Sequence, residues 1–557
     1  MVISNQEIQP VTPSNVNDCF LVLELSGDDP LFDKKKKLLE DKGFVLHDRV
    51  EFNEALEPEI EDAKLAKLLQ RARIFHLNDV ELYFGPMNMD PPRPEEFYSP
   101  RNELEALNFI LSRIEHNSEK SKGNNASLKY LRDAIIKRVY NLGDIHKLET
   151  RLVDATCVNE TLFMQWAQTY GVKSKLQIAY FEGTGRGALA AEDLEVGDIA
   201  LEIPISVVIS EDLVYESDMV HKLKNIEGIS AETMLLLWSM RERHNFQSKY
   251  KVYFDSLPEK FNTGLSFSLD AMITLHETLV FEEISQAKEH LRSTYEELFP
   301  ALSISYPDIF SPQYYSWEQY LWACELWYSN SMKIMFPDGK LKTCLIPVAG
   351  FLNHSVCPHI LNYGRVDSAS KTLKFPLSRP CKRGEQCYLS YGNLSNSHLL
   401  TFYGFLPQEM NPFDIIPLDI VEAPECSSKD GYLACDTTTY MVRGTWLSVN
   451  HDIFYYGLPS PLLDHLRRVG NPCVQTMTLS KENLENERKI IEDLFAIFDS
   501  MMEKLGDSEL EDRKNKKLDV QLAIEYKDRQ RNVVSSLLTA CYKGRKMLEA
   551  ELEKLDG

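Results

Sequence analysis

Apolar residues in the first part of the chain follow two different patterns, one typical of a strand and the other typical of helices. The apolar run at residues 20–23 predicts a short buried strand, whereas Leu65, Leu68 and Leu69 recur at helical spacing. A further helical pattern covers residues 104–114, and no motif with an evident chemical role precedes residue 155. We therefore predict that residues 1–155 form a small α+β or helical region, to which the sequence assigns no function.

From residue 156 the pattern changes to short extended runs that enclose a helical stretch. Residues 199–204 alternate between apolar and polar side chains as a half-buried strand does, after a turn at Gly197. Residues 210–335 have a mainly helical pattern, and short strands with turns return after Gly339. This order predicts one β-rich domain at 156–410, interrupted by a helical insert at about 210–335.

Helical spacing fills the remaining segment, residues 411–557. Apolar side chains line one face from Ile491 to Leu505 with a period near 3.6 residues, and Gly506 is well placed to end that helix. A second apolar stripe runs from Val533 to Leu552. We predict an all-α C-terminal domain here, so that the fold class of the whole chain is α+β.

The charge balance narrows the classes of partner. The 557 residues include 84 Asp and Glu against 61 Lys and Arg, a net charge of -23. Such a field repels polyanions, so no nucleic-acid partner is predicted, and a protein partner of basic character would be attracted. The plainer interpretation is that the surplus of acidic side chains only keeps the protein soluble.

Composition also bears on the compartment. Residues 1–33 contain no Lys or Arg, unlike a signal or transit peptide, and no apolar run is long enough to span a membrane. The eleven cysteines lack Cys-x-x-Cys spacing, which predicts reduced thiols and no metal site. The expectation is a monomer in the cytoplasm or the nucleus that binds no membrane.

Two polar motifs of the β-rich region are candidate ligand contacts. A glycine-rich turn at 183–187 includes Thr184, Gly185 and Arg186, and glycine lets backbone groups approach a ligand closely. The pair Asn353-His354 offers an amide and an imidazole that both donate and accept hydrogen bonds. Each motif also has a purely structural interpretation, as a surface turn and as an internally bonded turn.

Two tyrosines follow the Asn-His pair. Tyr391 ends the extended run 386–391, and Tyr403 comes twelve residues later beside two phenylalanines. A tyrosine hydroxyl at the floor of a channel can orient a nucleophile, although aromatic residues are also common in the cores of sheets.

Taken in order, these motifs resemble the split-SET protein methyltransferases of the Rubisco large-subunit methyltransferase-like family. Matching blocks also include 196–198, 201–204, 248–258, 384–386 and 395–400, and the final helices resemble the family's Rubisco-methyltransferase-type substrate-binding domain. The resemblance implies S-adenosylmethionine as cofactor and Tyr391 as the catalytic residue. It implies cofactor contacts from Thr184, Gly185, Arg186, Asn353, His354 and Tyr403.

Two positions depart from the family pattern. Gly350 stands where the family usually has an aspartate, and Asn330 stands where it usually has an arginine. Both belong to the substrate side of the implied site. Each lost charge-assisted contact costs on the order of 1.5–3 kcal/mol, enough to weaken binding or to alter the acceptor.

Three interpretations follow from the sequence. The first is a methyltransferase that modifies a protein side chain, with lysine as the expected acceptor, histidine as the second, and a non-histone protein as the favoured substrate. The second is a catalytically silent SET-fold scaffold that binds a protein partner, which the residues at 330 and 350 favour. The third is a structural or assembly protein that works through residues 1–155.

Overall fold

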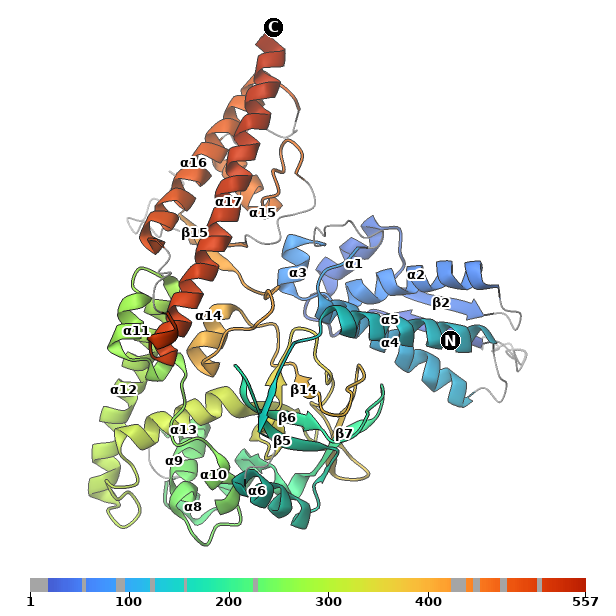
Figure 1. Cartoon of the computed structure of the whole chain (residues 1–557). Coiled ribbons are helices and arrows are strands. Elements are labelled where there is room, and N and C mark those ends of the chain that lie inside the picture. Colours follow the sequence, from blue (N-terminus) through green and yellow to red (C-terminus); the bar gives the residue numbers. More distant parts are fainter. Residues whose placement is uncertain are drawn as a thin grey trace, which may run out of the picture. The chain divides into compact units, whose positions relative to one another are not determined.

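The computed structural model describes residues 19–52, 57–86, 96–120, 126–154, 158–223, 229–421, 437–443, 451–470, 478–507 and 513–556. The chain divides into two compact units (Figure 1). One comprises Met1–Leu82 with Arg93–Lys147, and the other comprises Tyr83–Pro92 with Leu148–Gly557. The sequence-based boundaries at residues 155 and 410 stay a prediction.

The first unit is a small α+β assembly, as predicted. Strand β1 (Cys19–Glu24) pairs antiparallel with β2 (His47–Phe52), and buried Leu21, Leu65 and Leu104 belong to its apolar interior. Its helices are α1 (Phe32–Asp41), α2 (Pro58–Phe75), α4 (Pro100–Lys120), α5 (Ala126–Ile145) and the greater part of α3 (Asp79–Phe84), whose last two residues belong to the second unit.

The β-rich part of the second unit consists of three small sheets. The first has the order β11-β14-β6-β5-β3, with bounds Asn353–His354, Gln386–Leu389, Gly185–Ala190, Leu176–Phe181 and Leu152–Asp154. The second has the order β12-β13-β7-β4, with bounds Val366–Asp367, Thr372–Pro376, Ile199–Pro204 and Lys173–Ser174. The third joins β8 (Ile209–Ser210), β10 (Leu341–Leu345) and β9 (Ser331–Met335).

Helices fill the interval between β8 and β9, where the insert was predicted. Four of these helices begin at a Ser or Thr whose side chain accepts a backbone N–H, because such oxygens satisfy donors that a helix start leaves unpaired. These N-caps are Ser230, Ser268, Thr278 and Ser316. The helices are α6 (Val158–Thr169) before the insert, then α7 (Glu211–Tyr215), α8 (Asp218–Leu223), α9 (Ala231–His244), α10 (Lys251–Ser256), α11 (Leu269–Thr274), α12 (Leu279–Ser305) and α13 (Trp317–Asn330).

The C-terminal region is mainly helical, but it also contains a hairpin, so the prediction of an all-α domain needs correction. Strand β15 (Ile416–Val421) pairs antiparallel with β16 (Thr437–Val442), whose three threonines suit a pleated strand. Pro417 and the short alternation of β15 hid this strand within an otherwise helical pattern. The helices are α15 (Ser460–Gly470), α16 (Lys481–Leu505) and α17 (Leu518–Asp556).

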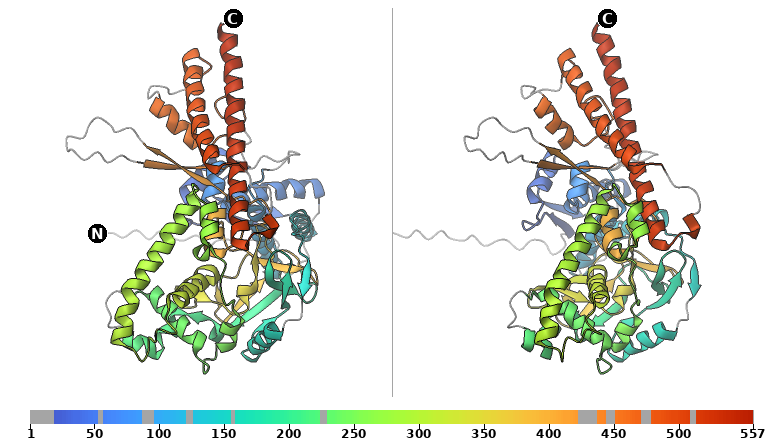
Figure 2. Two further views of the ribbon diagram at one scale, coloured as in Figure 1. Left: turned by 60° about the vertical axis from the view of Figure 1, so that its left-hand side comes forward. Right: turned by 90° about the vertical axis from the view of Figure 1, so that its left-hand side faces the viewer.

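The long helices α16 and α17 pack side by side (Figures 1 and 2). The stripe predicted on α16 is buried, including Ile491, Leu494 and Phe498, and Gly506 ends the helix with φ +63°. Both helices share a separate apolar core with the β15–β16 hairpin.

The first turns of α17 belong to a different apolar cluster, which also includes α11 and residue Leu400. Asp519 Oδ2 accepts the Ser268 N–H at 2.9 Å, and Arg529 Nη2 donates to Pro407 O at 2.6 Å. Residues 399–407, which include Tyr403, are therefore braced from the C-terminal side. Among the described helices, none has the length and apolar content needed to cross a membrane.

Gly404 provides a test of how the segment that carries Tyr403 is held. Its φ is +73°, and a Cβ there would lie 2.1 Å from Asn262 O. Gly197 has a similar φ of +89° with nothing within 4 Å of a Cβ. We expect Gly197→Ala to cost only the left-handed backbone penalty of about 1–2 kcal/mol, and Gly404→Ala to cost about 1–3 kcal/mol more from overpacking.

Urea denaturation followed by tryptophan fluorescence measures both variants, because every tryptophan except Trp446 lies between residues 166 and 327. Equal midpoint shifts for the two variants would show that the Asn262 contact does not constrain Gly404.

Candidate active site

The site forms where β14 lies between β11 and β6. Strand β14 runs parallel to β11, with His354 opposite Leu389, and antiparallel to β6, with Cys387 opposite Ala188. The chain leaves β14 at Leu389 and reaches Tyr391 two residues later. Three segments that are far apart in the sequence thus meet at one end of β14.

Tyr391 is held at both its backbone and its hydroxyl. Its N–H donates to His354 Nδ1 at 3.1 Å, and its hydroxyl donates to Leu352 O at 2.9 Å. Its ring stacks on Tyr403, with centroids 5.1 Å apart. Burial raises the pKa of Tyr391 well above its ordinary value, with smaller contributions from Tyr403 and Tyr363, so the hydroxyl stays protonated at physiological pH.

The Asn353-His354 pair is brought to the predicted place, but its side chains are engaged within the protein. Asn353 Nδ2 donates to Arg186 O at 2.9 Å, which ties β11 to β6. His354 Nδ1 accepts from the Tyr391 N–H, as described above. Both residues therefore position the glycine turn and Tyr391, whatever else they contact.

The glycine-rich turn is only partly directed toward a cavity. Arg186 Nη1 donates to Ser256 O, and its guanidinium lies 3.7 Å from Glu160 Oε1 and over the Phe351 ring. Thr184 Oγ1 lies 3.4 Å from Gln386 Oε1, and neither Thr184 nor Gly185 lines the two cavities described next. Of the three predicted turn residues, Arg186 alone lines one of these two cavities.

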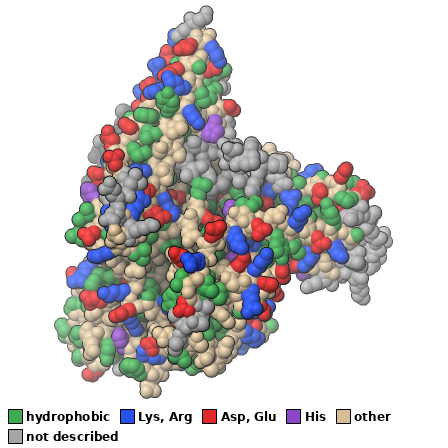
Figure 3. Space-filling model, viewed as in Figure 1, with side chains coloured by type: hydrophobic (Ala, Val, Ile, Leu, Met, Phe, Trp, Pro, Cys, Tyr) green, Lys and Arg blue, Asp and Glu red, His purple; other side chains and the backbone are tan. Residues whose placement is uncertain are grey.

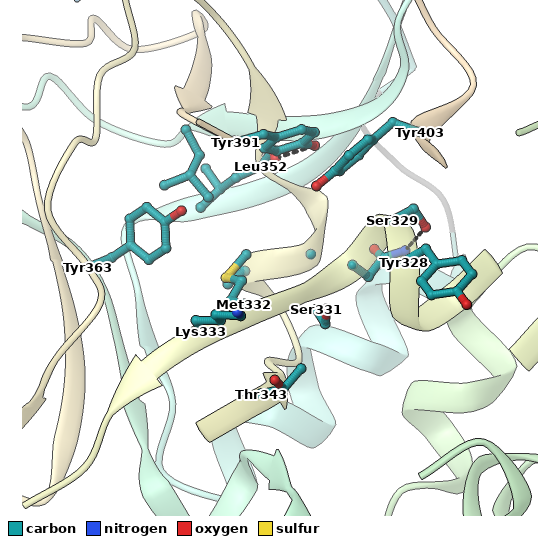
Figure 4. A pocket seen from close by; sticks show the side chains of 14 residues that line it. Tyr328, Ser329, Ser331, Met332, Lys333, Thr343, Leu352, Tyr363, Tyr391 and Tyr403 are labelled. Atoms are coloured by element: carbon teal, nitrogen blue, oxygen red, sulfur yellow. Dashed lines mark hydrogen bonds between the residues drawn. The ribbon is translucent and has the colours of Figure 1, made fainter. Parts of the chain in front are cut away.

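Two cavities adjoin Tyr391 and Arg186. The larger, of about 400 Å³, is lined by Tyr391, Tyr403 and Tyr363 together with residues 328–333 (Figure 4). The smaller, of about 220 Å³, is lined by Arg186 and by apolar and aromatic residues of the insert and η3 (Ala349–Phe351). Its lining residues are Arg186, Tyr253, Leu257, Pro258, Phe261, Asn330, Val348, Gly350 and Phe351.

Asn330 and Gly350, the two departures from the family pattern, line both cavities. A Cβ on Gly350 would lie 3.3 Å from Asn330 Oδ1, so the two positions face each other. Asn330 Nδ2 donates to Ser329 Oγ at 2.7 Å. The small, uncharged pair therefore forms the shared wall of the two cavities.

Backbone strain marks the same wall. Val348 has φ +72° and ψ -48°, a conformation that a β-branched residue rarely adopts, and it lines the smaller cavity just before Gly350. Such strain persists only where the surrounding structure imposes it, and it concentrates at functional sites. The sequence carries no signal for it, because valine is not a turn residue.

Other residues that line the cavities carry no signal in the sequence. Tyr363, Tyr328, Lys333 and Thr343 line the larger cavity from three separate places in the chain. Tyr253 was part of a matching block, but its place in the smaller cavity follows only from the packing of α10. The residues that line the larger cavity share only one feature visible in the sequence, namely that several of them are tyrosines.

A trio of possible metal ligands lies away from these cavities. His359, Cys381 and Cys387 are buried, and their ligand atoms lie within 4.8 Å of one another. However, His359 Nδ1 accepts the Tyr388 N–H at 3.0 Å. The hydrogen bond with Cys381 and burial raise the pKa of Cys387, so this thiol is protonated when no metal is bound. The absence of a metal stays a prediction.

Comparisons with known proteins point to the same family as the motifs. The chain is 26% identical over 260 residues to [fructose-bisphosphate aldolase]-lysine N-methyltransferase of Arabidopsis thaliana, which covers 45% of this chain and 52% of that protein. It is 25% identical over 321 residues to the Rubisco large-subunit N-methyltransferase of Pisum sativum, which covers 55% and 63% respectively. No family model matches.

Solved structures share the fold. The structure of Rubisco LSMT bound to sinefungin and monomethyllysine superposes with a TM-score of 0.53 at 16% identity, over 72% of this chain and 96% of that one. The LSMT SET domain bound to lysine and AdoHcy gives a TM-score of 0.52 at 17% identity, over 71% and 95%. The predicted resemblance to SET-domain lysine methyltransferases and the predicted SET fold are confirmed, although the sequence matches span only about half to two thirds of the curated relatives. The resemblance of the C-terminal domain stays a prediction.

The role of Asn353 in joining β11 to β6 can be tested by stability. Asn353→Ala leaves the Arg186 carbonyl without this donor, and we expect a loss of about 1–3 kcal/mol in the free energy of unfolding. Asn362→Ala is the matched control, because Asn362 is exposed and its loss is expected to change stability by less than about 0.5 kcal/mol. Indistinguishable urea midpoints for the two variants would contradict this role.

Proposed function

We propose that this protein is an S-adenosylmethionine-dependent methyltransferase that acts on a protein side chain, with lysine as the favoured acceptor and histidine as the second. One observation carries the proposal: the cavity that contains the Tyr391 and Tyr403 rings shares a wall with a second, aromatic-lined cavity at Arg186. A donor and an acceptor can therefore meet at that wall. The similarity to lysine methyltransferases supports this assignment.

The smaller cavity suits the chemistry of the cofactor. Aromatic faces from Tyr253, Phe261 and Phe351 can pack against a planar base, and N–H donors of Arg186 and Asn330 can bind a carboxylate. When bound, S-adenosylmethionine supplies a methyl group on a positively charged sulfur, which a nucleophile can displace. Asn353 and His354 keep the roles proposed from the resemblance, since both contact segments that border this region.

Tyr391 has the properties of a positioning hydroxyl. The Tyr391 hydroxyl donates its proton to Leu352 O, so its oxygen keeps lone pairs. These lone pairs can accept a hydrogen bond from the N–H of the side chain that is to be methylated. The raised pKa of Tyr391 means that it orients the nucleophile without acting as the base. Tyr403 stacks on it and limits its rotation, and orientation of this kind supplies much of the rate in reactions of two bound groups.

A silent scaffold is the second candidate, and the wall between the cavities favours it. Neither Asn330 nor Gly350 carries a charge that could hold a cofactor or substrate group, where relatives are expected to have an arginine and an aspartate. The two candidates differ in one observable. A methyltransferase transfers label from the cofactor to protein, and a scaffold binds a partner without doing so.

The remaining parts of the proposal rest on the sequence. We propose a non-histone protein substrate, action as a monomer, and a location in the cytoplasm or the nucleus. Light scattering of the purified protein and fractionation of cells test the last two directly.

We expect Tyr391→Phe to lower methyl transfer about 10²-fold while leaving the fold and cofactor affinity intact, because it removes one preorganised polar group at the reacting centre. The measurement is transfer of labelled methyl from S-adenosylmethionine to proteins of a cell lysate, followed by hydrolysis to separate methyl-lysine from methyl-histidine. Tyr295→Phe is the matched control. Its hydroxyl also donates to a carbonyl, that of Tyr315 at 3.1 Å, and it lines neither cavity.

Equal rates for wild type and Tyr391→Phe would remove Tyr391 from the reaction. No transfer by a folded wild-type protein would instead favour the scaffold.

A further inference from the structure

The mouth of the larger cavity contains a basic side chain in an otherwise uncharged lining. Lys333 on β9 is exposed and lines the cavity, and none of the other described residues that line it is charged. Figure 4 shows Lys333, Ser331 and Thr343 opposite the rings of Tyr391 and Tyr403. A segment that reaches Tyr391 through this cavity therefore passes Lys333.

A second basic side chain lies next to it. Arg365 forms an isolated parallel bridge with Met335, and Tyr363 lines the same cavity as Lys333. Lys333 lies two residues before Met335 on β9 and points to the same side of that strand, so the bridge brings Arg365 to the segment that borders Lys333. Arg365 is exposed, and the Met335 N–H to Gly364 O bond of 2.7 Å fixes the two segments to each other.

Neither basic group is neutralised by a described acid. No ion pair within the described part of the chain includes Lys333 or Arg365. The acids nearest in sequence are already paired, Asp338 with Lys342 and Asp367 with Lys374. The charge of Glu232 contributes, after burial, to the raised pKa of Tyr328, which lies across the cavity from Tyr363 in Figure 4.

Lys333 and Arg365 thus carry charges opposite in sign to the net charge of -23. Acidic and basic side chains are interspersed over the face shown in Figure 3, so the excess of negative charge is not gathered at one place on this face. Exposed charges more than about 10 Å apart are screened at ordinary salt concentrations, and close groups determine the interaction with a bound segment.

We infer that Lys333 and Arg365 select acceptor segments that carry an Asp or Glu close to the methylated residue. The inference rests on the proposed function and refines it, because the net charge alone predicts a basic partner. The carboxylate of such a segment pairs with Lys333 at the mouth, while the acceptor side chain extends past Tyr363 toward Tyr391.

The test uses two peptide libraries with a fixed central lysine, one with Asp and Glu at the flanking positions and the other with Lys and Arg. Methyl transfer from labelled S-adenosylmethionine and fluorescence anisotropy are measured on both libraries. We expect wild type to prefer the acidic library about 3- to 10-fold in both measurements, the range that one or two exposed ion pairs provide. Lys333→Glu should remove or reverse that preference, and high salt should reduce it.

Lys382→Glu is the charge-matched control. Lys382 is exposed and lies in the turn before β14, at the opposite end of that strand from Tyr391. It should keep the preference for acidic flanks. Equal binding of both libraries by wild type, or a preference unchanged in Lys333→Glu, would overturn the inference.

The two measurements separate this inference from the proposed function. If anisotropy shows tighter binding of the acidic library but no methyl is transferred, the result would support selection of acidic segments by Lys333 and would reject the enzyme activity. Methyl transfer without a charge preference would do the reverse.

Discussion

Everything at the site depends on β14 lying between β11 and β6. This arrangement joins segments on the two sides of a long helical insert, and the bond from Asn353 Nδ2 to Arg186 O spans 167 positions in sequence. The His354 Nδ1 to Tyr391 N–H bond fixes the chain where it leaves β14. Polar side chains that bridge backbone groups in this way determine where the cavities open, because they set the relative positions of the three segments.

The shared wall of the cavities combines strain with small side chains. Val348 has an unfavourable backbone conformation. At Gly350, an added Cβ would meet only Asn330 Oδ1 within 4 Å. A structure that departs from local preference at one place usually does so for function. Charged residues at 330 and 350 would narrow the passage, so the uncharged pair leaves room at the price of weaker electrostatic binding.

The sequence predicted the elements that have local signals. The α16 stripe, the glycine turn and the order of motifs around the insert each depend on residue types at short spacing, and the structure has all three. The β15–β16 hairpin was missed because Pro417 and a short alternation resemble a break between helices. Tyr363 and Lys333 could not be predicted as site residues, because their place at one cavity follows from contacts between segments that are distant in sequence. Val348 could not be predicted either, because no residue type at this position signals a positive φ.

The central claim is that the paired cavities bind a methyl donor beside Tyr391. Calorimetric titration of the 557-residue protein with S-adenosylmethionine tests it most directly. The account predicts one site with a micromolar Kd, a binding free energy of about -8 kcal/mol. A folded protein that shows no binding up to millimolar S-adenosylmethionine would contradict it.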